Sequence, residues 1–179
     1  MKATGMIRKI DDLGRVVIPK EIRKTLRIRE GDPMEIYVEK NGEIILKRFA
    51  PLGDLVDEVI CLADVIAKNT GFSVYITDNK TVLAVNSKYK KGNLDKQISD
   101  ELLVILEDRA IWINKGEMPI KITEKDSESN YLSQVIAPII SEGDVVGSII
   151  LFSEGTRKNI TEIELKMLQV ATDFLSNQM

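Results

Sequence analysis

Positively charged residues crowd one short stretch near the amino terminus of this 179-residue chain. Placed on a helix at about 100° per residue, four of them fall within one sector of about 100°. Like charges this close repel one another, and an anionic partner would relieve the repulsion. Arginine suits such a partner because its planar fork grips phosphates or guanine edges with two hydrogen bonds. The four cations of this helix are Lys20, Arg23, Lys24 and Arg27.

Three more cations extend this basic surface: Arg8 and Arg15 flank a predicted turn at 11–14, and Lys9 adjoins the first of them. Residues 1–53 hold twelve bases against eight acids, although the whole chain has a net charge of −3. A basic head on an acidic body is typical of a protein that binds nucleic acid. A solvated basic face is the alternative that charge alone leaves open. The basic cluster, which we predict to bind DNA, comprises Arg8, Lys9, Arg15, Lys20, Arg23, Lys24 and Arg27.

The composition argues against most enzyme chemistry. The chain has no histidine and a single cysteine, Cys61, which excludes histidine-dependent nucleophiles, cysteine-cluster metal sites and internal disulfides. Neighbouring carboxylates oppose a reactive thiolate at Cys61. Glycine-rich phosphate motifs are absent from the sequence. We therefore predict that the protein is not an enzyme and holds no metal or cofactor, with a nucleotide hydrolase in the second half as the enzyme alternative.

The first fifty residues read as a small β-rich unit. Pro19 ends a strand and suits the first turn of a helix, and Asn41-Gly42 is a strong hairpin signal. The apolar residues are too few for a comfortable independent core, so we predict oligomerisation through this segment. The expected elements are strands at 5–10 and 15–18, the turn at 11–14, a helix at 20–26 that buries Ile22 and Leu26, and strands at 34–40 and 43–49.

The remainder reads as an α+β domain. Its last helix has a clear start, because Thr161 and Glu164 form a capping-box pair between the staple residues Ile160 and Leu165. Gly71 is a predicted helix end. The other expected elements are a helix at 54–68, strands at 72–77 and 81–85, a helix at 95–109, a short strand near 120–122, and strands at 133–140 and 145–152.

Several segments of the first fifty residues carry a family resemblance: Thr4–Asp11, Leu13–Pro19, Glu21–Arg23, Thr25-Leu26, Ile28, Glu35–Val38 and Ile44–Lys47. They resemble the AbrB family of bacterial transition-state regulators. The resemblance implies a swapped-hairpin β-barrel, in which two chains interleave their strands into one DNA-binding unit. It also implies DNA contact at Arg8, Arg15, Arg23 and position 24, where this chain has Lys in place of the arginine frequent in the family. Lysine keeps the charge but lacks the guanidinium fork.

The second half resembles a GAF domain, a sensory fold that binds small molecules or pairs subunits, in its order of helices and strands. The full signature of cyclic-nucleotide-binding members is missing: Asn79-Lys80 is present, but Phe152 is followed by Ser153-Glu154-Gly155-Thr156. No cysteine is placed for a bilin, and haem would lack a histidine ligand. The resemblance leaves a small-molecule ligand open without naming it.

These observations predict a two-domain α+β protein. Residues 1–53 would form the AbrB-like barrel that dimerises and binds double-stranded DNA. Residues 54–179 would form a GAF-like domain that pairs again through its first and last helices, giving a homotetramer. The resemblance implies a cytoplasmic, nucleoid-associated regulator of sporulation genes, both activator and repressor, without a membrane partner. The alternative is an antitoxin, although antitoxins with this barrel usually end in a disordered toxin-wrapping tail.

Overall fold

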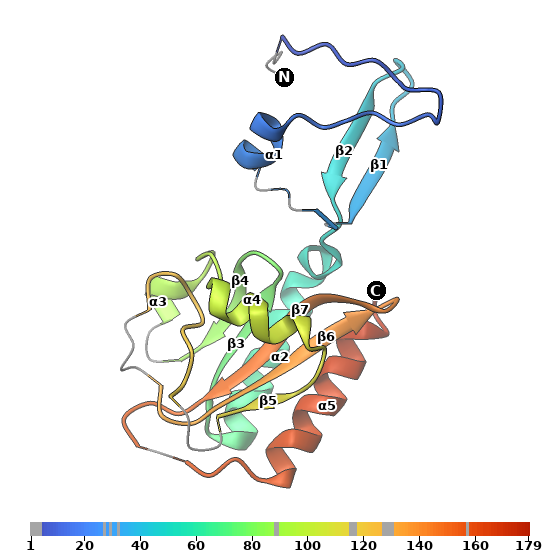
Figure 1. Cartoon of the computed structure of the whole chain (residues 1–179). Helices are drawn as coiled ribbons and strands as arrows, with labels where there is room; N and C mark the ends of the chain where they lie inside the picture. The colour runs from blue at the N-terminus through green and yellow to red at the C-terminus, as the bar shows by residue number, and fades with distance from the viewer. Residues whose placement is uncertain are drawn as a thin grey trace. The chain divides into compact units, whose positions relative to one another are not determined.

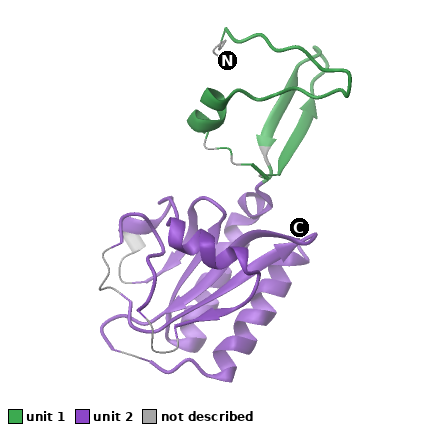
Figure 2. Ribbon diagram, in the orientation of Figure 1, with its two compact units in different colours: residues 1–49 green, residues 50–179 purple. Residues whose placement is uncertain are grey.

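The computed structural model divides the chain into two compact units, unit 1 (residues 1–49) and unit 2 (residues 50–179) (Figures 1 and 2). Both α-helices and β-strands are present, which confirms the mixed α+β prediction. The main chain alone is described at positions 48, 90 and 91. The structure describes residues 5–26, 28, 30–31, 33–87, 90–114, 118–126, 131–156 and 158–179.

Unit 1 contains the helix α1 (Lys20–Leu26) and an antiparallel hairpin of β1 (Met34–Val38) and β2 (Ile44–Arg48). The helix has the predicted bounds, and it begins directly after Pro19. The hairpin turns at Asn41-Gly42, where Gly42 has a φ of 84° that glycine adopts without strain. Both local predictions for this part of the chain are confirmed.

The two strands expected at 5–10 and 15–18 do not form in the single chain. The turn between them does form: the Asp11 N–H donates to the Arg15 carbonyl at 3.1 Å, and the Gly14 N–H donates to the Asp11 carbonyl at 3.0 Å. A strand needs a neighbour that completes its ladder of hydrogen bonds. The described residues of unit 1 supply no such neighbour to either segment, so the strand prediction is wrong for one chain alone.

The described part of unit 1 lacks an apolar core. Pro19 is its only buried residue, and α1 buries none of its side chains. The prediction that α1 buries Ile22 and Leu26 is therefore wrong for the single chain: Ile22 is half-buried and Leu26 is exposed. The described part of unit 1 thus leaves both apolar side chains of the helix only partly covered or exposed.

Unit 2 is built on a five-stranded antiparallel sheet of order β4-β3-β7-β6-β5 (Figure 1). Side chains of α2 and α5 pack with one face of the sheet, and those of α4 pack with the other. The elements in chain order are η1 (Pro51–Leu55), α2 (Val56–Thr70), β3 (Ser73–Asp78), β4 (Val82–Asn86), α3 (Lys90–Asn93), α4 (Asp100–Glu107), β5 (Trp112–Ile113), β6 (Gln134–Ser141), β7 (Asp144–Phe152) and α5 (Glu162–Ser176).

Local signals set the ends of the two long helices. Gly71 follows α2 in the left-handed conformation, with a φ of 69°, as predicted for a helix end. At the start of α5, the Thr161 N–H donates to Glu164 at 2.8 Å, and the Thr161 hydroxyl accepts from the Ile163 N–H at 3.2 Å. Burial opposes ionisation, yet the hydrogen bonds from Thr161 hold the pKa of Glu164 below its usual value. The predicted capping box is confirmed.

The helix expected at 95–109 is shorter. The Ser99 side chain accepts a hydrogen bond from the Leu102 N–H at 3.0 Å, and this cap starts α4 at Asp100. The Ile98 N–H instead donates to the Lys80 carbonyl, which joins the preceding residues to the edge of the sheet. The short helix α3 was not expected from the sequence.

The short strand expected near 120–122 is also absent as a strand, and only an isolated bridge joins Thr123 to Ile98. The buried side chain of Gln134 takes the place of a strand neighbour. It accepts from the Ile120 N–H at 2.9 Å and donates to the Ile120 carbonyl at 3.2 Å. A side-chain amide therefore satisfies backbone groups that a ladder would otherwise pair.

One glycine in β7 marks a close approach. Leu52 of η1 is fully buried and lies against Gly147. A Cβ atom at Gly147 would stand 2.1 Å from the Thr77 carbonyl oxygen and 2.6 Å from Leu52 Cδ1. Only glycine fits between these groups, so η1 belongs to the packed body of unit 2.

Candidate nucleic-acid interface

Six of the seven members of the basic cluster lie within the described residues, and Arg27 lies outside them. Five of the six are exposed, and Arg23 is half-buried. Of the five exposed members, two lie on α1, two precede the turn at 11–14, and one follows this turn. The exposed members are Arg8, Lys9, Arg15, Lys20 and Lys24.

The helix α1 presents its lysines and its arginine differently. Lys20 and Lys24 are four residues apart, so their side chains emerge on the same side of the helix. Arg23 Nε is shielded from solvent and has no hydrogen-bond partner among the described residues. The helical projection that placed these cations in one sector correctly predicts that the two lysines are exposed. The partial burial of Arg23 depends on packing.

A contact that the sequence reasoning missed organises the turn before α1. Asp11 Oδ1 accepts from the Leu13 N–H at 3.0 Å and from the Arg15 N–H at 2.8 Å. Asp11 Oδ2 accepts from Arg15 Nε at 2.9 Å, which makes an exposed ion pair. The hydrogen bonds from Arg15, first from its backbone and then from its side chain, hold the pKa of Asp11 below its usual value. The available signal was an aspartate at the first position of a turn, where its side chain bonds the backbone two residues on.

The other exposed members of the basic cluster are free to meet an anion. Across the part of unit 1 that the structure describes, Arg8, Lys9, Lys20 and Lys24 make no ion pair with a carboxylate. Their exposed N–H groups match phosphate oxygens in charge and in hydrogen-bonding capacity. The arrangement can therefore bind a polyanion.

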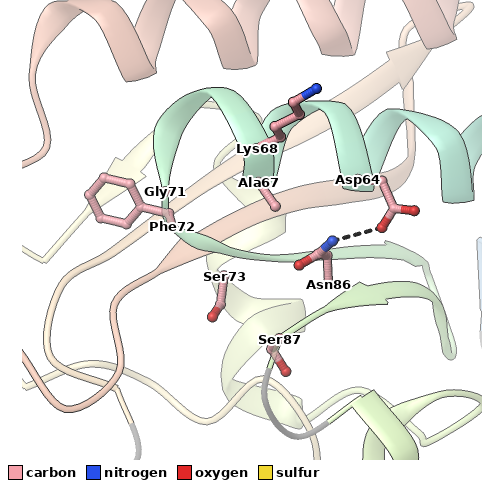
Figure 3. A pocket seen from close by; sticks show the side chains of 8 residues that line it. All are labelled: Asp64, Ala67, Lys68, Gly71, Phe72, Ser73, Asn86 and Ser87. Atoms are coloured by element: carbon pink, nitrogen blue, oxygen red, sulfur yellow. Dashed lines mark hydrogen bonds between the residues drawn. The ribbon is translucent and has the colours of Figure 1, made fainter.

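Unit 2 has an open groove of about 460 Å³ where α2 ends beside β3 and β4 (Figure 3). Its polar lining includes Lys68 and an internal hydrogen bond of 2.7 Å from Asn86 Nδ2 to Asp64 Oδ1. One acid, one base, an amide and two serines do not select a single class of ligand. The lining residues are Asp64, Ala67, Lys68, Gly71, Phe72, Ser73, Asn86 and Ser87.

A buried tyrosine network lies on the α4 side of the sheet. The Tyr131 hydroxyl donates to Asp126 Oδ2 at 2.7 Å, and the Tyr75 hydroxyl accepts from Asn93. Burial raises the pKa of both tyrosines, so both stay neutral. Asp126 Oδ2 also accepts from the N–H groups of Ile122 and Thr123. The network joins Tyr131 to Asp126. The described residues contain no group of three or more potential metal ligands.

Comparison with known proteins gives two family matches, which meet close to the boundary between unit 1 and unit 2. Residues 7–51 match the family described as antidote-toxin recognition MazE, bacterial antitoxin. Residues 52–179 match the family described as stage V sporulation protein T C-terminal, transcription factor. The second match alone covers more than half of the chain.

Relatives agree with this division. The N-terminal region is 59% identical over 51 residues to the transition state regulatory protein AbrB of Bacillus subtilis (strain 168), covering 28% of this chain and 52% of that protein. Unit 2 has the GAF fold: the GAF domain of PixJ from Thermosynechococcus elongatus superposes with a TM-score of 0.56 at 13% identity, over 73% of this chain and 90% of that one.

An AbrB-like N-terminal unit followed by a GAF-like unit defines the class of the protein, a transcription regulator. Over its full length the chain is 42% identical to stage V sporulation protein T of Bacillus subtilis (strain 168), covering 99% of that protein. The chain therefore belongs to the stage V sporulation protein T family of sporulation transcription regulators. Within the described residues, no helix is both long and apolar enough to cross a membrane.

Proposed function

We propose that this protein binds double-stranded DNA through the basic cluster and so activates some sporulation genes and represses others. The observation that carries the proposal is the set of exposed cations in unit 1 that lack a carboxylate partner among the described residues. Family membership supplies the transcriptional role. Phosphate contacts of this kind bind with little dependence on sequence, and DNA shape then contributes to the choice of site.

Unit 1 is proposed to fold as a dimer. Its apolar side chains are exposed in the single chain, among them Ile7 at 88%, Val17 at 70% and Val38 at 74%. Burying each of them would contribute about 1.5–3 kcal/mol. A second chain that pairs with 5–10 and 15–18 would also complete the hydrogen bonds of these two segments. Dimerisation thus supplies both the core and the strands that one chain lacks, and it doubles the number of cations on the DNA-binding surface.

Unit 2 is proposed to pair through α5 and its neighbour α2, which makes the protein a tetramer. Along α5, Ile163, Met167, Val170 and Phe174 follow the four–three–four spacing of a helix–helix seam. Three of the four are exposed, and Met167 is half-buried. Ile60 adds an exposed apolar side chain on α2. Two dimerising surfaces per chain would give a tetramer with two dimers of unit 1, which we call the DNA-binding heads. Once one head is bound, the other is held at a high effective concentration near a second site, which strengthens binding to paired sites.

The seam predicts a specific change of oligomeric state. Val170→Asp places a carboxylate at the centre of the seam, where burying a charge without a partner is unfavourable. We expect the tetramer to separate into dimers held by unit 1, as measured by sedimentation equilibrium or light scattering. Val104→Asp is the matched control, because Val104 is similarly exposed but lies on α4. A Val170→Asp protein that remains tetrameric would contradict the proposed seam.

The proposed DNA contact is tested by salt. If the basic cluster neutralises phosphates, the logarithm of the association constant falls linearly with the logarithm of salt concentration, by about 0.9 per phosphate. A dimer that uses at least four of its cations should therefore give a slope of about −3.6 or steeper. Fluorescence anisotropy with a labelled duplex between low and moderate salt measures this slope. A flat response would reject binding through the phosphate backbone.

The antitoxin alternative receives less support. The MazE match covers 7–51 alone, whereas the remaining residues match a transcription-factor family and fold as a GAF-like unit. If the protein were an antitoxin, it would co-purify with a toxin when its own gene and the gene beside it are expressed together. We propose instead that unit 2 sets the spacing of the DNA-binding heads, and that any small molecule bound there would act on that spacing.

A further inference from the structure

The Asp11–Arg15 pair joins an acidic residue to a surface proposed to bind an anion. Asp11 and Arg15 are both exposed, and Asp11 Oδ2 lies 2.9 Å from Arg15 Nε. The same carboxylate also accepts the backbone N–H groups of Leu13 and Arg15, so it is fixed to the turn by its other oxygen. Asp11 therefore links the backbone of the turn to Arg15 Nε, the nitrogen through which the guanidinium group joins the rest of the side chain.

This geometry leaves the outer end of Arg15 open. A guanidinium group has five N–H donors, one on Nε and four on the two terminal nitrogens. Asp11 occupies the donor on Nε. Among the described residues, the four outer donors have no partner. These are the donors that form the paired contact with a phosphate or a guanine edge.

We propose that Asp11 is a positioning residue for DNA binding: it holds Arg15 in an outward orientation that presents the terminal N–H pairs to DNA. The proposal rests on the proposed function of the basic cluster. A free arginine side chain loses considerable rotamer freedom when it is fixed on a ligand. Arg15 has already lost part of that freedom in the unbound protein, so less is lost when DNA binds.

Simple electrostatics predicts the opposite effect. A carboxylate beside the phosphate backbone repels it, so removing the negative charge would strengthen binding. That repulsion acts between exposed groups and is weakened by solvent and salt. The two explanations therefore differ in the sign of the change when the carboxylate is removed, which makes the proposal directly testable.

The experiment compares DNA affinity of the full-length protein and its variants, with one labelled duplex at one salt concentration. Asp11→Asn keeps an oxygen that can accept the backbone N–H groups of the turn but removes the charge that holds Arg15 Nε. We expect it to bind DNA about fivefold more weakly than the wild type. The matched control is Asp12→Asn, which removes the same charge at the next position. Asp12 is exposed and makes no hydrogen bond or ion pair among the described residues, so this variant should bind equally or more tightly.

A double variant separates positioning from support of the turn. In an Arg15→Ala background, Asp11→Asn should no longer weaken binding, because the side chain that it positions is gone. Binding by Asp11→Asn as tight as that of the wild type, or tighter, would overturn the proposal, and so would an equal loss with and without Arg15. If the wild type itself did not bind duplex DNA, the proposed function would be rejected. This result comes from the wild type alone, so it is distinct from a failure of the positioning proposal.

Discussion

Simultaneous replacement of Arg8, Arg15 and Arg23 by alanine is expected to weaken binding to duplex DNA by at least about 3 kcal/mol, or roughly a hundredfold. Each arginine that reads a base edge contributes about 1–3 kcal/mol. Dimerisation of unit 1 would present every side chain twice, so three substitutions would remove six guanidinium groups from one surface. Fluorescence anisotropy with a fixed duplex at constant salt measures the change.

The control is a second triple variant that has the same net charge as the triple arginine variant. Lys68, Lys80 and Lys125 are exposed lysines of unit 2, and their replacement by alanine also removes three positive charges. That triple variant should bind DNA nearly as well as the wild type, because these lysines do not belong to the basic cluster that is proposed to contact the phosphates. Equal losses in the two variants would mean that net charge, rather than the basic cluster, governs binding. Circular dichroism establishes that both variants are folded.

Gly147→Val is expected to lower the free energy of unfolding of unit 2 by about 3 kcal/mol or more. The first side-chain carbon alone would stand 2.1 Å from the Thr77 carbonyl oxygen, which the sheet holds in place. It would also displace Leu52, the fully buried residue of η1. Relief of the clash requires β3 and β7 to separate or η1 to leave its site. Urea denaturation followed by circular dichroism measures the loss.

Helix α3 offers a matched glycine, Gly92, which is exposed. A Cβ atom added at Gly92 would meet no described atom within 4 Å beyond its own stretch of helix, and the φ of Gly92 is not positive. Gly92→Ala should therefore change the free energy of unfolding by less than about 1 kcal/mol, in the direction of greater stability. If Gly147→Val were as stable as Gly92→Ala, the close contact between η1, β3 and β7 would not exist in solution.

The sequence by itself was sufficient for several features that depend on residues close together in the chain. The bounds of α1, the hairpin at Asn41-Gly42 and the left-handed Gly71 were all predicted. So was the capping box of Thr161 and Glu164. These features depend on interactions within about four residues, and a short window of sequence contains both partners. The mixed α+β architecture followed from the same local periodicities.

Features that depend on distant partners required the tertiary structure. The need for glycine at 147 comes from Leu52 and Thr77, which are separated from it by 95 and 70 residues. On α5, only the packed sheet decides that Leu168 and Leu175 are buried while Ile163 and Val170 are exposed. Which apolar groups are covered depends on the position of all the other elements, and no local pattern encodes that position. For the same reason, the segments expected to be strands before α1 remain without ladders in one chain, because their hydrogen-bonding partners are not nearby in sequence.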